Sequence, residues 1–240
     1  MSESPRAVLF DVDGTLVDTN YLHAVTWWQA FAQGGHYVPM ADIHRAIGMG
    51  SDQMLDRLLP GERDKDADDT LRTSHDALYA TYWSRLRPLP GAVDLLCACK
   101  ACGLTVVLAS SAGQAESGVL RAALDAEDAI DDATFAGDVE RTKPAPDLVR
   151  VALEKAAVPA GQAVFVGDTV WDARASRKAG VPCIGLLSGG IGREELADAG
   201  AAQIYADPGD LLARLPDSLI GRPAGARGLV TCPRVQAGGH

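Results

Sequence analysis

The sequence predicts an α/β protein, with a doubly wound parallel sheet and an all-helical domain inserted after the first strand. Over residues 89–220 short apolar runs alternate with helical patterns, which favours right-handed βαβ crossovers. Between residues 20 and 88 no convincing strand occurs, and such a block is far too long for an ordinary loop. With 240 residues, 47% of them hydrophobic, the chain can bury a sizeable core. We therefore expect a Rossmann-like core with an inserted helical cap domain.

The first strand is expected at the apolar run Ala7–Phe10, whose length and composition are typical of a buried strand. A long helical pattern begins near Asn20 and ends at Gly34-Gly35. Three further helices are expected before the chain returns to the sheet, at residues 41–47, 51–59 and 64–87.

Leu89-Pro90-Gly91 marks the return to the main domain. Beyond this turn, apolar and often β-branched runs predict strands at residues 104–109, 134–136, 163–166, 182–187 and 203–205. Between and after them, helices are expected at residues 92–101, 114–124, 146–157, 170–179 and 194–199.

These elements divide the chain into an α/β core of residues 1–19 and 89–220 and a helical cap of residues 20–88. The last stretch, 221–240, is rich in Gly, Pro, Ala and Arg and has no periodicity. We expect a flexible C-terminal tail there, with an extra docked strand at 228–232 as the alternative.

Charge and composition exclude several classes of protein. The net charge is −10 and the pI about 4.9, which argues against binding to nucleic acid or to an anionic membrane surface. No run approaches the roughly 20 apolar residues of a membrane span, and the polar first six residues precede no targeting segment. We expect a cytoplasmic protein, and nothing in the sequence indicates its oligomeric state.

The five cysteines are unevenly spaced, which is not typical of a secreted disulfide framework. Cys97, Cys99 and Cys102 cluster and could suggest a metal site, but no fourth ligand with suitable spacing follows them. We expect ordinary helix cysteines that face a core.

Two carboxylates directly follow the first strand, in Asp11-Val12-Asp13-Gly14-Thr15. Side chains two apart in an extended segment share a face, so Asp11 and Asp13 can meet one reactant if the extended path persists. Ser110 and Asp168 also follow apolar strands, and Lys143 precedes a helix. Because the carboxyl ends of parallel strands lie along one edge of the sheet, these side chains can converge there.

Four stretches in this order resemble the motifs of the haloacid dehalogenase-like (HAD) hydrolase superfamily, in its phosphoglycolate phosphatase and β-phosphoglucomutase-like branch. Taken singly, each stretch also fits a solvated turn, a helix cap or a surface charge. Their occurrence together, each at its expected strand or helix end, favours the family over roughly residues 5–215. The stretches are Asp11–Thr15, Leu108–Ser111, Lys143–Asp147 and Gly167–Asp172.

The resemblance implies phosphate monoester hydrolysis through an aspartyl-phosphate. Asp11 would be the nucleophile. Asp13 would protonate the leaving alcohol and then activate water, which requires it to start protonated, as a neighbouring carboxylate and partial burial would favour. Lys143 would neutralise the phosphoryl group and restrain Asp11, and the phosphate would be contacted by the hydroxyl groups of Thr15, Ser110 and Ser111.

A magnesium ion is implied as the cofactor, because a carboxylate that attacks a phosphate dianion meets like charge. Mg²⁺ prefers hard oxygen ligands. By resemblance these would be the carboxylates of Asp11 and Asp168 and the backbone carbonyl of Asp13. Asp172 would either hold a metal-bound water or orient Lys143.

The cap is where we expect specificity for a small phosphorylated metabolite. Arg45 precedes the Gly48-Met49-Gly50 turn, which in relatives faces the active site, and is a candidate contact for a substrate anion. A surface arginine is the alternative. Thr19 and His23 match the hinge threonine and histidine of β-phosphoglucomutase, and we include His23 among the substrate-binding candidates.

Three functions remain open, and a phosphatase is preferred. Dehalogenase members lack the aspartate found here as Asp13, so its presence favours phosphoryl transfer over carbon-halogen hydrolysis. A phosphosugar mutase of the β-phosphoglucomutase type is the alternative, but its cap arginine and lysine are not evident, and Ser51 stands near the arginine position. A non-catalytic binding protein is disfavoured because each catalytic position holds the expected residue type.

Overall fold

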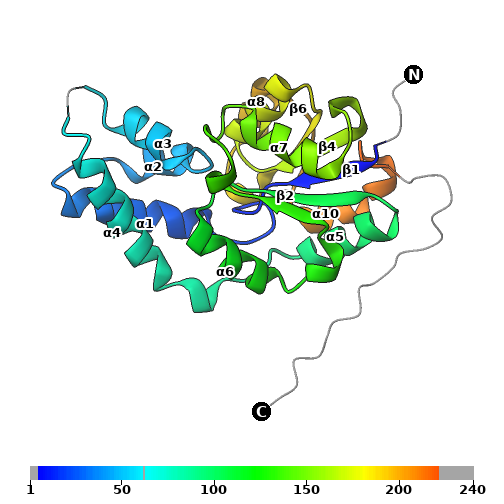
Figure 1. Ribbon diagram of the computed structural model, residues 1–240, viewed down its shortest axis with the longest axis horizontal. Helices are drawn as coiled ribbons and strands as arrows, with labels where there is room; N and C mark the ends of the chain where they lie inside the picture. Colours follow the sequence, from blue (N-terminus) through cyan, green and yellow to red (C-terminus); the bar gives the residue numbers. More distant parts are fainter. Residues whose placement is uncertain (1–4, 62, 222–240) are drawn as a thin grey trace, which may run out of the picture.

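One parallel sheet lies at the centre of the core in the computed structural model, which describes residues 5–61 and 63–221 (Figure 1). Its six parallel strands have the order β3-β2-β1-β4-β5-β6. Strands β2 and β3 are added on one side of β1 and strands β4 to β6 on the other, so the order of the connections reverses at β1. Open α/β sheets bind ligands beside the carboxyl ends of the strands at such a switch point. The strands are β1 Ala7–Phe10, β2 Thr105–Ala109, β3 Asp132–Thr134, β4 Ala163–Gly167, β5 Cys183–Leu186 and β6 Ala201–Tyr205.

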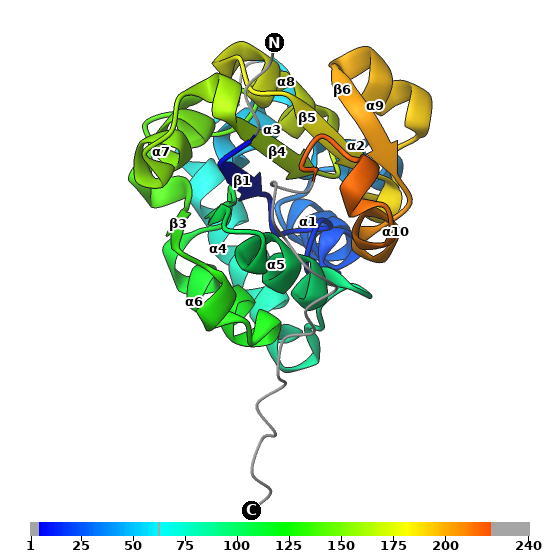
Figure 2. The same cartoon turned by 90° about the vertical axis from the view of Figure 1, so that its right-hand side faces the viewer.

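Helices cover both faces of this sheet, so the doubly wound arrangement is confirmed (Figures 1 and 2). Val8 and Phe10 of β1 pack on one face and Ala7 and Leu9 on the other, because side chains alternate along a strand. The first face is covered by α5 Ala92–Ala101, α6 Gln114–Leu124 and α10 Pro208–Ala213. The second is covered by α7 Asp147–Ala156, α8 Val170–Ala179 and α9 Arg193–Ala199.

The helical insertion is also confirmed, as a separate group beside the sheet in Figure 1. It has its own apolar core, which includes Trp27, Phe31 and Leu55. Its two connections to the main domain lie side by side, since Leu89 N donates to Leu16 O at 2.8 Å. The boundaries at residues 19/20 and 88/89 stay a proposed division. The helices are α1 Asn20–Gln33, α2 Met40–Ala46, α3 Ser51–Leu58 and α4 Ala67–Ala80.

Several element ends differ from the sequence-based expectation. The helix expected over 64–87 begins at Ala67 and ends at Ala80, and a 3-10 turn follows at Trp83–Arg85. The weak strand lies at 132–134 instead of 134–136, because Asp138 accepts a hydrogen bond from Phe135 N at 3.1 Å and turns the chain there. Helix α10 was missed, although Asp207 caps it by accepting from Asp210 N at 2.8 Å.

Cys97 and Cys99 pack into the core under α5. No described helix is long and apolar enough to cross a membrane, and the cytoplasmic location stays a prediction. The tail expected at 221–240 lies outside the described residues, apart from Gly221.

Candidate active site

Five predicted site residues converge at the carboxyl edge of β1 and β4. Asp11 follows β1, Asp168 follows β4 and Asp172 lies in the first turn of α8, while Lys143 comes from the segment before α7. Lys143, Asp168, Asp172 and Thr15 have no exposed surface, and Asp11 is 3% exposed. The structure thus brings together residues that are far apart in the sequence.

The contacts within this cluster link the nucleophile candidate to one cation and one hydroxyl. Lys143 Nζ pairs with Asp11 Oδ1 and, at 2.7 Å, with Asp172 Oδ1. Thr15 Oγ1 lies 2.7 Å from Asp168 Oδ1 and 3.2 Å from Asp11 Oδ2. Since a hydroxyl has one proton to donate, Thr15 serves the two carboxylates alternately.

The charges in the cluster do not balance. Three carboxylates face one ammonium, which leaves a net charge of −2 when all four groups are ionised. Burial raises the pKa of Asp11 well above its usual value despite the opposing charge of Lys143, and burial with the charge of Asp172 raises the pKa of Asp168 to about 7. Ligand atoms of the three acids lie within 4.8 Å of one another. This donor set fits a divalent cation such as Mg²⁺.

Asp172 is fixed by the start of α8. Its Oδ2 accepts from Thr169 N at 3.0 Å, while Thr169 Oγ1 accepts from Asp172 N at 3.2 Å, a reciprocal capping box. Gly167 is required beside it, because an added Cβ would lie 2.5 to 2.8 Å from the Asp172 carboxylate. Of the two roles considered for Asp172, the geometry supports direct orientation of Lys143.

Asn20 also belongs to the cluster and was not anticipated. Its Nδ2 donates to Asp168 Oδ2 at 2.7 Å from the start of α1. Gly14, at φ 72°, turns the chain tightly, and an added Cβ there would lie 2.3 Å from Asn20 Nδ2. The sequence placed Asn20 at the start of a helix, and that position alone does not indicate a contact with Asp168.

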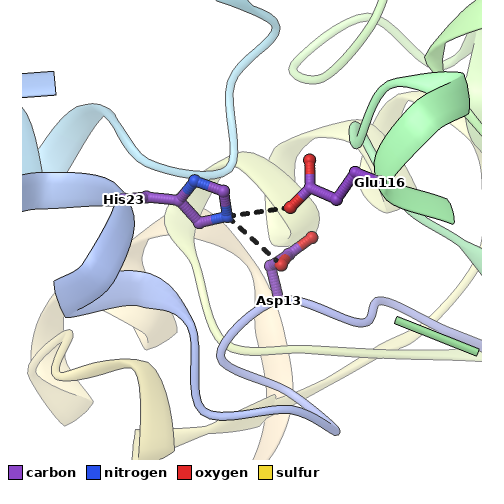
Figure 3. A group of neighbouring side chains, drawn as sticks. All are labelled: Asp13, His23 and Glu116. Carbon is purple, nitrogen blue, oxygen red and sulfur yellow. Dashed lines mark hydrogen bonds and ion pairs between the residues drawn. The ribbon is translucent and has the colours of Figure 1, made fainter. Parts of the chain in front are cut away.

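Asp13 points into a second cluster with His23 of α1 and Glu116 of α6 (Figure 3). His23 Nε2 lies 3.4 Å from Asp13 Oδ1 and 3.2 Å from Glu116 Oε1. Burial lowers the pKa of His23, but the carboxylates of Glu116 and Asp13 outweigh burial and raise this pKa to about 10. The ring is therefore an imidazolium at neutral pH. This cation joins the cap to the core. Glu116 was missed, because an acid in a first helical turn is common.

The ionisation of Asp13 differs from the expectation. Burial raises its pKa, but hydrogen bonds from His23, Thr19 and Ser110 outweigh burial and hold the pKa below the usual value. Thr19 Oγ1 lies 2.7 Å and Ser110 Oγ 3.0 Å from this carboxylate. The prediction that Asp13 starts protonated is therefore wrong for the substrate-free chain, and the protonated group beside it is His23.

Helix α4 of the cap supports the imidazolium. His23 stacks on Tyr79, with ring centroids 4.0 Å apart, and His23 Nδ1 lies 3.2 Å from His75 Nε2. Burial lowers the pKa of His75 to about 4, so its neutral ring can accept a hydrogen bond from the Nδ1–H of His23. The positive charge of this histidine pair therefore resides on His23.

The two serines after β2 have different partners. Ser110 is fully buried, and its hydroxyl donates to Asp13 while accepting from Ala112 N at 3.0 Å. Ser111 Oγ lies 3.3 Å from Gly48 O and ties the cap loop to the core. In this arrangement Ser110 positions Asp13, and Ser111 lines the cavity.

A cavity of about 210 Å³ lies between cap and core, with Asp11 and Asp13 in its wall. Trp27, Met54 and Arg72 contribute from the cap, and Arg72 was not anticipated. In the sequence, Arg72 lies one helical turn before His75, so the two side chains share a face of α4. This spacing predicts a place in the cavity only once α4 is known to face the core.

Arg45 does not line this cavity. Its side chain is 56% exposed, and Nη2 lies 3.3 Å from Glu195 Oε1 of α9. The expected substrate contact is therefore not supported, because this part of α2 turns Arg45 along the surface towards the core. The surface alternative is the one the structure shows.

Comparisons with known proteins agree with this geometry. A family model described as haloacid dehalogenase-like hydrolase matches residues 5–180. A phosphoglycolate phosphatase of Rhodospirillum rubrum is 30% identical over 217 residues, covering 85% of this chain and 88% of its own. The crystal structure of a hydrolase from Pseudomonas syringae superimposes with a TM-score of 0.84 at 33% identity, over 90% of this chain and 99% of its own. A β-phosphoglucomutase from Clostridium difficile, at 19% identity and a TM-score of 0.78 over 90% of this chain and 97% of its own, shares the fold.

Proposed function

Because the chain belongs to the haloacid dehalogenase-like hydrolases, we propose that it is a Mg²⁺-dependent phosphatase that hydrolyses a small phosphate monoester. One observation carries this proposal: the buried Asp11 carboxylate, restrained by Lys143, lines a cavity that also contains Asp13. A nucleophile and a proton-transfer group therefore face the same small space.

Asp11 is the proposed nucleophile, through the carboxylate oxygen that Lys143 does not hold. Attack on the phosphorus forms an aspartyl-phosphate and expels the alcohol, so one difficult step is divided into two. Lys143 keeps the carboxylate in place and offers positive charge to the transferring group. When Asp11 loses its negative charge in the aspartyl-phosphate, the Thr15 hydroxyl can donate its hydrogen bond to Asp168 instead, because it contacts both carboxylates.

Asp13 is the proposed acid and base. In the substrate-free chain it is a carboxylate, which is the form that activates the water attacking the aspartyl-phosphate. The leaving alcohol needs a proton first, and the source we assign is the Nε2–H of His23, 3.4 Å from Asp13 Oδ1. The proton passes through Asp13 to the departing oxygen, and the proton that Asp13 later takes from the attacking water returns to His23. Thr19 and Ser110 hold Asp13 in register for both steps.

Mg²⁺ would be held by the carboxylates of Asp11 and Asp168 and, by the family resemblance, by the backbone carbonyl of Asp13. When bound, it supplies the positive charge that lets an anionic nucleophile approach a phosphate dianion. Asp172, engaged with Lys143 and Thr169, is assigned to positioning and not to direct coordination.

The small cavity supports a small phosphorylated metabolite as the substrate. A relative that is 30% identical to this chain is named phosphoglycolate phosphatase, and this name supports a substrate as small as phosphoglycolate. The mutase alternative keeps one argument, because Arg72 places a cation in the cap wall where the sequence had shown none.

The direct test is release of inorganic phosphate from an aryl phosphate, with Mg²⁺ and with a chelator, followed by a panel of phosphorylated metabolites. A phosphatase releases phosphate and alcohol in equal amounts only when Mg²⁺ is present. If none of the substrates released inorganic phosphate in the presence of Mg²⁺, the result would favour a binding protein on the same scaffold.

A further inference from the structure

We propose that Asp13, His23 and Glu116 form a binding site for Zn²⁺, separate from the proposed Mg²⁺ site, and that Zn²⁺ bound there inhibits turnover. The binding part of this inference follows from the arrangement of the three side chains. The inhibition rests on the proposed phosphatase function, because it assumes that Asp13 transfers protons during the reaction.

The three side chains direct one nitrogen and two oxygen atoms towards a common point (Figure 3). One ligand atom from each residue lies within 4.8 Å of the other two. Imidazole suits Zn²⁺, whereas Mg²⁺ takes oxygen ligands. This mixed cluster therefore favours a different metal from the carboxylates around Asp11.

The spacing of these atoms fits a tetrahedral metal site. His23 Nε2 lies 3.4 Å from Asp13 Oδ1 and 3.2 Å from Glu116 Oε1. Bonds of about 2.0 to 2.2 Å from Zn²⁺ to nitrogen and oxygen place neighbouring donors of a tetrahedron about 3.3 to 3.6 Å apart. Zn²⁺ can therefore replace the Nε2 proton with small shifts of the side chains, and the displaced proton leaves to water.

Two buried oxygen atoms at the cluster have no hydrogen bond of regular geometry in the described part of the chain. His23 Nε2 has one proton, which Asp13 accepts, so Glu116 Oε1 is left without a hydrogen bond. Tyr79 is 2% exposed and stacks on His23, and its hydroxyl is the second such atom. Burial and the charges of Asp13 and Glu116 raise the pKa of this hydroxyl, so it stays a donor. A zinc ion would pair Glu116 Oε1, and a water on the ion would accept from Tyr79.

The charge of the cluster also favours a dication. In the described part of the chain, Asp13 and Glu116 both form their ion pairs with His23. The imidazolium neutralises one of the two carboxylates and leaves one negative charge. A dication next to a neutral imidazole balances both, and its double charge attracts the carboxylates more strongly than a proton does.

The position of the cluster explains why a metal ion there would inhibit. All three residues line the cavity of about 210 Å³, which gives the ion an entry path and leaves its fourth position to water. His23 belongs to α1 of the cap, whereas Asp13 and Glu116 belong to the core. Zn²⁺ held by all three would fasten the cap to the core and engage the Asp13 carboxylate, which could then no longer transfer protons.

The test measures Zn²⁺ binding by calorimetry on the full chain, with Mg²⁺ at a concentration that saturates the Asp11 and Asp168 site. The parent should bind one equivalent of Zn²⁺ that Glu116→Gln and His23→Asn each weaken by at least about 100-fold. Each variant loses a direct ligand, and loss of an outer contact alone costs about 10- to 100-fold. Circular dichroism reports whether each variant is folded. Glu116→Gln keeps the shape of the side chain, so it tests the site even if His23→Asn does not fold.

Controls separate this site from other places where Zn²⁺ could bind. His36→Asn removes a cap histidine that does not line the cavity and should bind Zn²⁺ as the parent does. Asp168→Asn weakens the proposed Mg²⁺ site and should also keep this Zn²⁺ equivalent. Co²⁺ in place of Zn²⁺ should give the strong visible absorption of a tetrahedral ion without the near-ultraviolet band of a thiolate ligand, which excludes the cysteines.

In aryl phosphate turnover, Zn²⁺ should lower kcat, and added Mg²⁺ should not restore it, because the two cations occupy different sites. Inhibition that excess Mg²⁺ reverses would place Zn²⁺ at Asp11 and Asp168 and overturn the inference. So would an unchanged Zn²⁺ affinity in folded Glu116→Gln and His23→Asn.

The outcome is separable from the proposed function. If an aryl phosphate is hydrolysed but Zn²⁺ binding does not depend on His23 and Glu116, the phosphatase stands and the zinc site falls. If no phosphate ester is hydrolysed but Zn²⁺ binding depends on both residues, the zinc site stands and the phosphatase falls.

Discussion

Asp172 Oδ1 lies 2.7 Å from Lys143 Nζ, and both side chains are fully buried. The same ammonium pairs with Asp11, so Asp172 fixes the cation that restrains the nucleophile. Burial lowers the pKa of Lys143, but the carboxylates of Asp11 and Asp172 outweigh burial and raise this pKa above its usual value. The capping box with Thr169 holds Asp172 in turn, so the start of α8 determines where Asp11 points.

The first prediction concerns this positioning role. Asp172→Asn should lower kcat by about 10- to 100-fold, the range typical of groups that orient a site from one contact away, with little change in KM for an aryl phosphate. Steady-state kinetics at saturating Mg²⁺ measure it. Asp198→Asn, on the exposed side of α9, is the control. An unchanged kcat would show that Lys143 does not need Asp172.

Asp11→Asn should abolish turnover, with a loss of at least about a thousandfold, because an amide is not a nucleophile. The fold should persist, since the substitution is isosteric and leaves Lys143 paired with Asp172. Circular dichroism and single-turnover phosphate release are the measurements. Near-normal kcat in a folded variant would remove Asp11 from the mechanism.

Asp168→Asn should chiefly raise the Mg²⁺ concentration required, by about 10- to 100-fold. One carboxylate ligand is lost while Asp11 remains, and the contacts from Thr15 and Asn20 can persist. The melting temperature provides a readout without turnover, because Mg²⁺ stabilises the parent by mass action. A Mg²⁺ titration identical to that of the parent would refute the ligand assignment.

Local patterns in the sequence predicted the sheet and the buried cluster well. Asp11 and Asp168 follow strongly apolar strands, so their place at one sheet edge follows from parallel pairing alone. Gly180 ends α8 where predicted, because it adopts a left-handed conformation at φ 76°.

Residues that meet across the cap and core were harder to predict. Arg45 and Arg72 are both cap helix arginines, and only the docking of the cap decides which of them faces the cavity. Glu116 likewise acquires its role by facing His23 from the other domain. The pKa of Asp13 depends on that same encounter, and for this reason its expected protonation was wrong.

A stability prediction comes from the cap ion pair of Arg63 and Asp68, whose side chains are 12% and 8% exposed. Arg63 Nε and Nη2 donate to the two Asp68 oxygens at 3.0 and 2.8 Å, and these bonds lower the pKa of Asp68. A lowered pKa in the folded state stabilises the protein above the unfolded value near 4, and this stability is lost as the pH falls through the folded value.

Asp68→Asn should therefore reduce the free energy of unfolding by about 1–3 kcal/mol at pH 7, and the difference from the parent should shrink below about pH 4. Urea unfolding at both pH values tests this, with Asp66→Asn, exposed at the N-cap of α4, as the control. A difference that is the same at both pH values would mean that the ion pair does not carry the effect.

The last prediction separates hydrolase from mutase by the acceptor of the phosphoryl group. Both enzymes would begin with transfer to Asp11, so labelling that residue cannot distinguish them. A mutase must exclude water and hold a sugar hydroxyl near Asp13 while cap cations anchor the distal phosphate. Among the described residues that line the cavity of about 210 Å³, Arg72 alone carries a guanidinium, and Ser51 also lines the wall. Water should therefore be the acceptor. With a hexose 1-phosphate, inorganic phosphate should appear in equal amount with the sugar, and adding the matching bisphosphate should not accelerate it. Rapid bisphosphate-dependent formation of hexose 6-phosphate, with little free phosphate, would assign the chain to the mutases instead.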